Sequence, residues 1–515
     1  MTHLPPTVRP PTRAEIRDIA EQYYFELSDE EVEDYRGLIE EKMGFCERID
    51  ELSDRTGSRL QARRDPGYRA TAAEDPRNAI VTVCNVETDH EGPLSGYEIG
   101  VKDNIAVADV EMTCASKVLT GYRPVNDAPV VERLLEAGAR ITAKTNMDEM
   151  AVSGSGEMSA FGPILNPFDD DYLAGGSSGG SAVAVATGMV DAALGSDQAG
   201  SLRTPASWSG CVGFKPTHGL TSFRGVAPLG HSFDHVGPMA DDVEDVARVL
   251  GVIAGEDPHD PRQGRVKVGD YVGALGRGVD GLDIGVVEEA FEFAGHEAAV
   301  NEGVRAAVDR LDDLGATADF VSIPWHVDAF FVWLAVENEE TAVMWDADNT
   351  GYFVDGRYDT DLAAAFGKAR RAQADEFAPT VKLKCLLGQY LKQQFHGRYH
   401  GTASNLREEL TAAYDERLDE YDLLAMPTTP MTAFELETDL TRQEAVNRAQ
   451  GKKGRTRNTM PFNMSGHPAV SIPCGRDDND LPIGLMLVGN QFDEETVLAA
   501  ANAFEGATEW TELRF

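Results

Sequence analysis

Hydrophobic and polar positions follow different periods in different parts of the chain. Residues 12–55 are predicted to be helical. Ser28 and Glu31 fit a helix-capping box, and the apolar side chains that follow them recur at roughly helical spacing. From about residue 70, short β-branched runs alternate with helical stretches, one of which stops at a glycine. Such alternation predicts an α/β fold in which helices cover a largely parallel or mixed β-sheet.

The same pattern places individual elements. Strands are predicted at 80–83, 140–144, 282–287, 318–323 and 422–426, and helices over 128–139 and near 301–313. Proline-rich residues 1–11 are predicted to be extended, and loops are predicted at 255–281 and 437–458.

An arginine-rich link at 59–69 separates the two kinds of pattern. We therefore expect a helical extension over 1–70 and a larger domain over 71–515. We also expect the extension to serve in dimerisation.

Charge narrows the range of partners. The chain has 515 residues, with 87 acidic and 46 basic side chains and a net charge of −41. A field of this sign repels nucleic-acid phosphates and anionic membranes, so neither is an expected partner. Acidic runs are spread along the chain rather than collected in a tail, which favours a protein adapted to a salty cytoplasm.

Cysteine usage and hydropathy point to the same compartment. The six cysteines form no C-x-x-C pair, so we expect them to be reduced rather than to staple the fold. The first thirty residues contain no apolar segment of the kind found in signal peptides. The longest weakly polar run, 182–190, is too short to cross a bilayer. A soluble cytoplasmic protein is expected.

The strongest chemical signal lies in 174–222, where two Gly/Ser-rich loops flank a helix and a short strand. Such loops aim backbone N–H groups at a phosphate or an oxyanion. A phosphate loop would need a lysine after the glycines, and none follows. Ser178 fits the G-x-S-x-G nucleophile elbow, but the residues before it resemble a loop rather than the strand that this motif requires.

Three motifs in chain order resemble those of the amidase signature hydrolases. They are GVKDN at 100–104, GGSSGGSA at 175–182 and GSDQAGSLRTPA at 195–206. Further matching segments lie at 214–219, 233–240, 426–430, 458–475 and 481–489. The resemblance extends over about 75–507 and implies the fold of that family, a mixed sheet covered by helices on both faces.

Within this family the chain resembles most the stand-alone amidases that act downstream of nitrile hydration. The features that favour them are S-D-Q before the nucleophile, the segments 256–263 and 322–333, and the helical extension. The resemblance implies a homodimer that hydrolyses small carboxylic acid amides to acid and ammonia, with neither a cofactor nor a metal ion.

The resemblance also assigns roles to residues. It implies that Ser201 is the nucleophile, that Ser177, after a cis peptide bond, relays protons, and that Lys102 is the base. A serine hydroxyl needs a base to become a nucleophile. A lysine can be that base only if burial holds it neutral.

The N–H groups of Gln198, Ala199, Gly200 and Ser201 are expected to form the oxyanion hole. Ala199 replaces a more usual glycine, which would cost roughly 1 kcal/mol if the position needs a positive φ. Alignment with the family places Ala151 where a backbone carbonyl meets the substrate.

Other features fit more ordinary explanations. His231 and His235 have the i, i+4 spacing of metal ligands but lack a third ligand, so no metal site is expected. The aromatic residues of 325–333 fit either core packing or an apolar acyl pocket. Cys211 has no convincing histidine partner and is expected to pack in the core. Asp197 and Arg203 are expected to support the catalytic loop.

Two other functions remain open. The glutaminase subunit of a tRNA-dependent amidotransferase would carry the same triad, although it usually lacks a long helical extension. A non-catalytic binding protein on the same fold would not need Lys102, Ser177 and Ser201 together. The sequence does not specify which small-molecule amide is the substrate.

Overall fold

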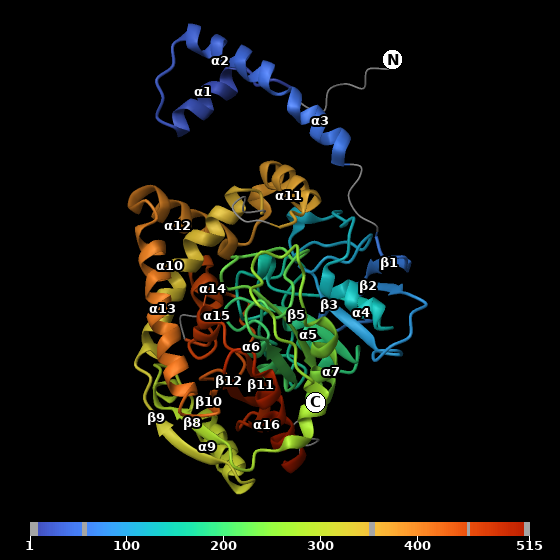
Figure 1. The fold of residues 1–515 in the computed structure, drawn as a ribbon, viewed down its shortest axis with the longest axis vertical. Helices are drawn as coiled ribbons and strands as arrows, with labels where there is room; N and C mark the ends of the chain where they lie inside the picture. The colour runs from blue at the N-terminus through green and yellow to red at the C-terminus, as the bar shows by residue number, and fades with distance from the viewer. Residues whose placement is uncertain (1–8, 54–58, 350–355, 451–453, 509–514) are drawn as a thin grey trace. The chain divides into compact units, whose positions relative to one another are not determined.

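The computed structural model describes residues 9–53, 59–349, 356–450, 454–508 and 515 (Figure 1). The chain divides into two compact units, Met1–Leu60 and Gln61–Phe515. This division falls before the boundary expected near residue 70. The reason is that the arginine-rich link contains strand β1 (Arg63–Arg69), which pairs with β2 (Ile80–Glu87) in the sheet of the second unit.

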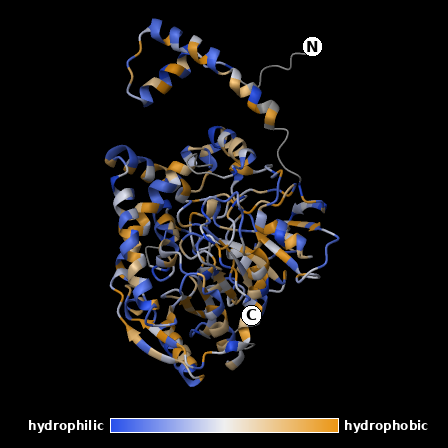
Figure 2. Ribbon diagram, in the orientation of Figure 1, coloured by the Kyte–Doolittle hydropathy of each residue, from blue (hydrophilic) through white to orange (hydrophobic). Residues whose placement is uncertain are grey.

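The first unit is helical, but its helical stretch is interrupted. Its described elements are α1 (Arg13–Gln22), α2 (Asp29–Lys42) and α3 (Gly44–Ser53). Ser28 caps α2 as expected, because its Oγ accepts the Glu31 N–H and the Glu31 carboxylate accepts the Ser28 N–H. The single stretch expected over 12–55 is therefore wrong between α1 and α2, where Tyr24 adopts a left-handed φ of 58°. Hydrophobic and hydrophilic residues alternate along all three helices (Figure 2).

The second unit is built on one mixed sheet, as expected. The described residues form 12 strands in the order β1-β2-β4-β3-β5-β7-β6-β11-β12-β10-β8-β9. The remaining strands are β3 (Glu98–Lys102), β4 (Arg140–Thr145), β5 (Ala192–Asp197), β6 (Val212–Lys215), β7 (His235–Ala240), β8 (Asp283–Val287), β9 (Thr317–Val321), β10 (Leu423–Pro427), β11 (Ala469–Arg476) and β12 (Pro482–Gly489). All five strands expected from the sequence are present.

Helices pack against both faces of this sheet, which confirms the expected α/β fold. They are α4 (Pro129–Glu136), α5 (Gly179–Ala186), α6 (Arg203–Ser209), α7 (Val243–Ile253), α8 (Tyr271–Ala274), α9 (Ala298–Asp313), α10 (Trp325–Asp346), α11 (Thr360–Gln373), α12 (Pro379–Phe395), α13 (Arg398–Leu418), α14 (Arg442–Ala449), α15 (Pro461–Ser465) and α16 (Glu494–Ala507). Short 3₁₀ turns lie at η1 (Lys117–Leu119), η2 (Glu149–Ala151), η3 (Leu275–Arg277), η4 (Glu288–Phe291) and η5 (Ala374–Glu376).

The two expected loops contain helices. Residues 255–281 include α8, whose N-cap Asp270 accepts the Gly273 N–H, and residues 437–458 include α14. Helix α14 begins at a capping box between Thr441 and Glu444, which is a helix signal within the expected loop. Both helices are short, so they left only a weak periodic signal.

The centre of the sheet positions the chemistry. Strands β3 and β5 are parallel neighbours, with Ile99 opposite Ala192 and Val101 opposite Leu194. Their carboxyl ends therefore lie at the same edge, where β3 ends at Lys102. Helix α5 packs its small and apolar residues into the core next to β5, so the loop before α5 meets the same edge.

Candidate active site

Lys102, at the end of β3, contacts the loop before α5 and the end of β5. Its Nζ lies 2.8 Å from Ser177 Oγ, 2.9 Å from Ser196 Oγ and 3.3 Å from the Ser196 carbonyl oxygen. Asn104, two residues further on, donates to Ser196 Oγ at 3.0 Å. The lysine is thus held by hydroxyl and carbonyl oxygens rather than by a carboxylate.

Burial determines the protonation of Lys102. The residue is fully buried, and loss of hydration lowers its pKa to about 7, although the charges of Asp197, Asp148 and Asp234 oppose this shift. Since burial disfavours the charged form, a neutral amine is populated near pH 7. This is the condition that a lysine must meet to accept a proton.

The loop that carries Ser177 is tightly enclosed. The Gly176–Ser177 peptide bond is cis, as the resemblance implied. A Cβ on Gly176 would lie 2.0 Å from Asp148 Oδ2, so only glycine fits there. The Asp148 carboxylate is itself fixed by the N–H groups of Gly156 and Met158, at 3.1 and 2.9 Å.

Asp197 shapes the loop that carries Ser201. Its carboxylate accepts the N–H of Gly200 at 2.6 Å, the N–H of Leu202 at 3.0 Å and Arg203 Nε at 3.0 Å. Burial alone would raise the pKa of Asp197, but the Arg203 charge and these donors lower it to about 2. Asp197 and Arg203 therefore support the loop as expected.

This arrangement corrects one expected role. Gly200 cannot direct its N–H to an oxyanion, because Asp197 already accepts it. Its φ of 128° nevertheless requires glycine. Within the described part of the chain, the N–H groups of Gln198, Ala199 and Ser201 are not donated to another protein group. Ala199 does not have a positive φ, so the strain considered for it does not arise.

A cavity of about 60 Å³ opens beside Ser201. Ser201 is 4% exposed, and its carbonyl accepts the N–H of Ser178, which ties the two serine loops together at 3.2 Å. The lining of the cavity also includes Ala151, Gln198, Ala199 and Lys384. Of the expected site residues, Ala151, Gln198, Ala199 and Ser201 thus line one cavity. Ser177 contacts Lys102 instead.

Helix α10 forms one wall of this cavity. Phe330, Trp333, Leu334 and Glu337 line it at helical spacing, and Trp333 Nε1 donates to the carbonyl of Gln198 at 2.9 Å. The aromatic cluster is therefore divided, since Phe331 is 59% exposed instead. Phe330 and Trp333 line the pocket, so part of the cluster has the second of the two roles that the sequence allowed.

Several supporting residues escaped the sequence analysis. Asn463, on α15, donates to the Asp197 carbonyl at 3.0 Å and accepts from Arg203 Nη2 at 2.8 Å. Thr459 donates to the Ala199 carbonyl. Both lie in the segment 458–475 that carries the resemblance, but a single sequence does not show which of its side chains turn toward the loop. Ser196 stood inside the G-S-D motif and could have been singled out.

The competing nucleophile candidates do not fit the site. Ser178 Oγ donates to the Ser196 carbonyl at 3.1 Å, and no strand precedes it within the described segment 171–177. The nucleophile-elbow alternative is therefore excluded. Cys211 is buried in an apolar cluster, and this burial raises the pKa of its thiol.

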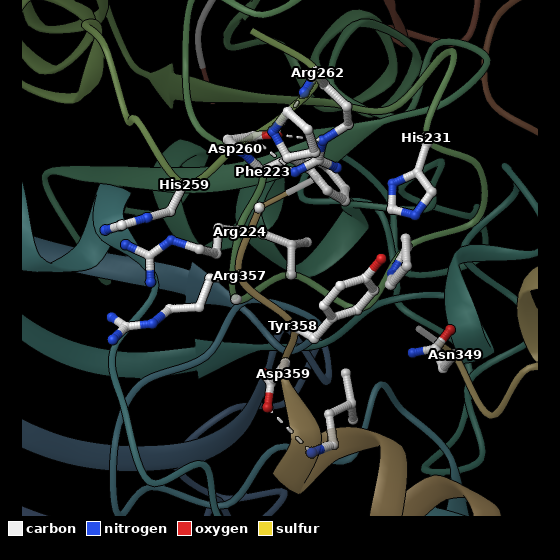
Figure 3. Close-up of a pocket in the computed structure, with 16 residues that line it drawn as sticks. Phe223, Arg224, His231, His259, Asp260, Arg262, Asn349, Arg357, Tyr358 and Asp359 are labelled. Atoms are coloured by element: carbon white, nitrogen blue, oxygen red, sulfur yellow. Dashed lines mark hydrogen bonds and ion pairs between the residues drawn. The ribbon is translucent and has the colours of Figure 1, made fainter. Parts of the chain in front are cut away.

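The paired histidines face different surroundings. His235 is buried, with Nδ1 at 2.8 Å from the Phe233 carbonyl and its ring 5.1 Å from that of His218. His231 instead lines a second cavity, together with Arg224 and Arg262 (Figure 3). The described residues contain no cluster of three or more His, Cys, Asp or Glu side chains arranged for a metal ion.

In the part of the chain that the structure describes, no helix has the length and apolar composition required to cross a membrane.

Comparison with known proteins identifies the architecture independently. The family described as Amidase matches residues 44–498. An enantioselective amidase from Rhodococcus rhodochrous is 36% identical over 511 residues, covering 97% of this chain and 96% of that protein. A glutamyl-tRNA(Gln) amidotransferase subunit from Methanosarcina mazei is 41% identical over 429 residues, covering 82% and 87%. The crystal structure of the corresponding Thermotoga maritima subunit superposes with a TM-score of 0.70 at 33% identity, covering 84% of this chain and 89% of that one.

Proposed function

The chain belongs to the amidase signature family and is a C–N hydrolase, and from this premise we propose that it hydrolyses small carboxylic acid amides to acid and ammonia. One observation carries the proposal. A buried lysine with a pKa of about 7 lies 2.8 Å from Ser177, and the Ser177 loop is tied to Ser201 at the substrate cavity.

Acylation follows from this arrangement. Ser201 Oγ attacks the amide carbonyl carbon as its proton passes to Ser177 Oγ, whose own proton passes to Lys102 Nζ. The developing oxyanion is stabilised by the uncommitted N–H groups of Ala199 and Ser201, with that of Gln198 beside them. The Ala151 carbonyl accepts a hydrogen bond from the amide nitrogen.

The tetrahedral intermediate then collapses. Lys102 returns its proton through Ser177 to the amide nitrogen, the C–N bond breaks, and ammonia leaves with the acyl group bound to Ser201. Water enters, loses a proton by the same relay and attacks the ester carbonyl. Release of Ser201 Oγ, which regains its proton, yields the acid and restores the starting state.

The extent of the similarity favours a stand-alone amidase. The Rhodococcus amidase covers 97% of this chain, a share too large to leave out the helical unit 1–60. The Methanosarcina protein leaves a larger part of the chain unmatched. We propose that the helical unit supports a homodimer and that the enzyme works without other subunits in the cytoplasm.

A glutaminase function is the second candidate, favoured by the 41% identity to the amidotransferase subunit. The two differ in their need for partners. Purified chain should release ammonia from amides between acetamide and benzamide, and should elute from gel filtration as an active dimer. Activity on glutamine that appears only after the other amidotransferase subunits are added would support the second function instead. No ammonia release under either condition would indicate a binding protein.

A further inference from the structure

Gln198 lines the cavity beside Ser201, and its side-chain amide is buried without a protein partner among the described residues. Gln198 is 2% exposed, and among the described residues neither its Oε1 nor its Nε2 has a hydrogen-bond partner. Leaving a buried polar group unpaired costs about 1–3 kcal/mol. Gln198 therefore presents one donor group and one acceptor that a bound ligand can satisfy.

The backbone of Gln198 is fixed on both sides. Trp333 Nε1 donates to its carbonyl at 2.9 Å, and the preceding carbonyl, of Asp197, accepts from Asn463 at 3.0 Å. Because the backbone is held and the side chain is buried, little further ordering is required when a ligand binds to the amide.

Two charged residues of the cavity, Lys384 and Glu337, are occupied by each other. Lys384 is 4% exposed and pairs with the Glu337 carboxylate, and it also donates to Asn338 Oδ1 at 3.0 Å. Arg455 donates to two backbone carbonyls through its terminal nitrogens, while its buried Nε has no hydrogen-bond partner among the described residues. Because the Lys384 and Glu337 charges cancel, this pair offers no uncompensated charge to an ionic substituent. The side-chain amide of Gln198 is uncharged and keeps both a donor and an acceptor uncommitted among the described residues.

We propose that Gln198 selects the acyl part of the substrate, favouring amides with an uncharged hydrogen-bonding substituent over hydrocarbon amides of the same size. The inference rests on the proposed function, in which Ala151 and the oxyanion donors already meet the reacting amide. Gln198 is then left for the acyl side, where it donates through Nε2 and accepts through Oε1. A hydroxyl or a second carboxamide can satisfy both roles.

Lactamide and isobutyramide provide a matched pair, since a hydroxyl in one replaces a methyl in the other. We expect wild-type kcat/KM for one lactamide enantiomer to exceed that for isobutyramide by about tenfold or more. Gln198→Met, which keeps length but removes both polar atoms, should bring this ratio near unity by lowering kcat/KM for lactamide more than kcat/KM for isobutyramide. Gln394→Met, on an exposed position of α12, is the control and should keep the wild-type ratio.

Equal rates for the two amides in the wild type, or an equal loss for both in Gln198→Met, would overturn the inference. Should the enzyme hydrolyse neither amide, the proposed function fails first. Binding then decides the inference separately, through thermal shifts measured in Ser201→Ala. A larger Tm increase with lactamide than with isobutyramide, abolished by adding Gln198→Met, supports the role of Gln198. Equal shifts, or no shift with either amide, refute it.

Discussion

The N–H of Gly200 lies 2.6 Å from Oδ1 of Asp197, a residue that is fully buried. This contact takes one amide away from the oxyanion position and turns it into part of the scaffold. The same carboxylate holds Leu202 and Arg203, so one side chain determines the path of the loop on both sides of Ser201.

Asp197→Asn should therefore be costly to both stability and activity. The change removes the charge that compensates the buried Arg203 guanidinium, and breaking such a pair from one side costs roughly 3–5 kcal/mol. Urea denaturation should show this loss. Asp191→Asn, at an exposed position just before β5, provides the control and should change little. Wild-type stability in Asp197→Asn would contradict the scaffold role.

Ser201→Ala should abolish amide hydrolysis and leave the fold intact, because it removes only the attacking oxygen. Ser178→Ala should keep most of the activity and lose about 1 kcal/mol of stability, since Ser178 Oγ only donates to the Ser196 carbonyl. Ammonia release and circular dichroism on both variants decide the matter. An active Ser201→Ala enzyme with an inactive Ser178→Ala enzyme would reverse the assignment.

Lys102→Arg should be nearly as inactive as Lys102→Met. Arginine keeps its proton at all accessible pH values and cannot act as a base, and general-base catalysis contributes about 10²–10⁴ in rate. In the wild type, kcat/KM should rise with pH through about 7, where Lys102 loses its proton. Substantial activity in Lys102→Arg would exclude this residue as the base.

The lowered pKa of Lys102 should also make the free energy of unfolding depend on pH. Its pKa is about 7 in the folded protein and near its ordinary value of 10.5 in the unfolded chain. Between these values the unfolded state binds more protons, so the contribution of Lys102 to stability rises with pH across this window. The free energy of unfolding of Lys102→Met, relative to wild type, should accordingly fall between pH 7 and pH 10. A difference that is independent of pH would argue against a buried, neutral lysine.

Gly176→Ala should inactivate the enzyme. The new methyl group would lie 2.0 Å from Asp148 Oδ2 and would displace the Ser177 loop. Gly264→Ala is the control, because a Cβ there meets no atom within 4 Å and the residue has no positive φ. Its activity and Tm should match the wild type. Full activity in Gly176→Ala would show that the loop can shift without loss of the relay.

The sequence specified the central architecture because its signals there are strong. Motifs of small residues locate the two serine loops, and short apolar or β-branched runs locate β2, β4, β8, β9 and β10. It failed at Gly200, where the path of the loop decides that Asp197, only three residues away, takes the N–H. It also failed at Asn463, because the contact with Asp197 joins residues far apart in sequence. The boundary at Leu60 was missed because β1 is arginine-rich and does not resemble a strand.

Salt should act on the fold more than on the chemistry. With a net charge of −41, side chains repel each other over a Debye length of about 30 Å at 0.01 M salt, but over only about 3 Å at 1 M. Unfolding separates these charges, so dilute salt favours the unfolded chain. The relay is buried, and its substrate is neutral, so KM should change little. We expect Tm to climb steeply from 0.1 M to molar salt, equally in sodium and potassium chloride, with specific activity following the folded fraction. A Tm that stays flat over this range would remove the case for adaptation to salt, and a rise in only one of the two salts would indicate a specific ion site rather than screening.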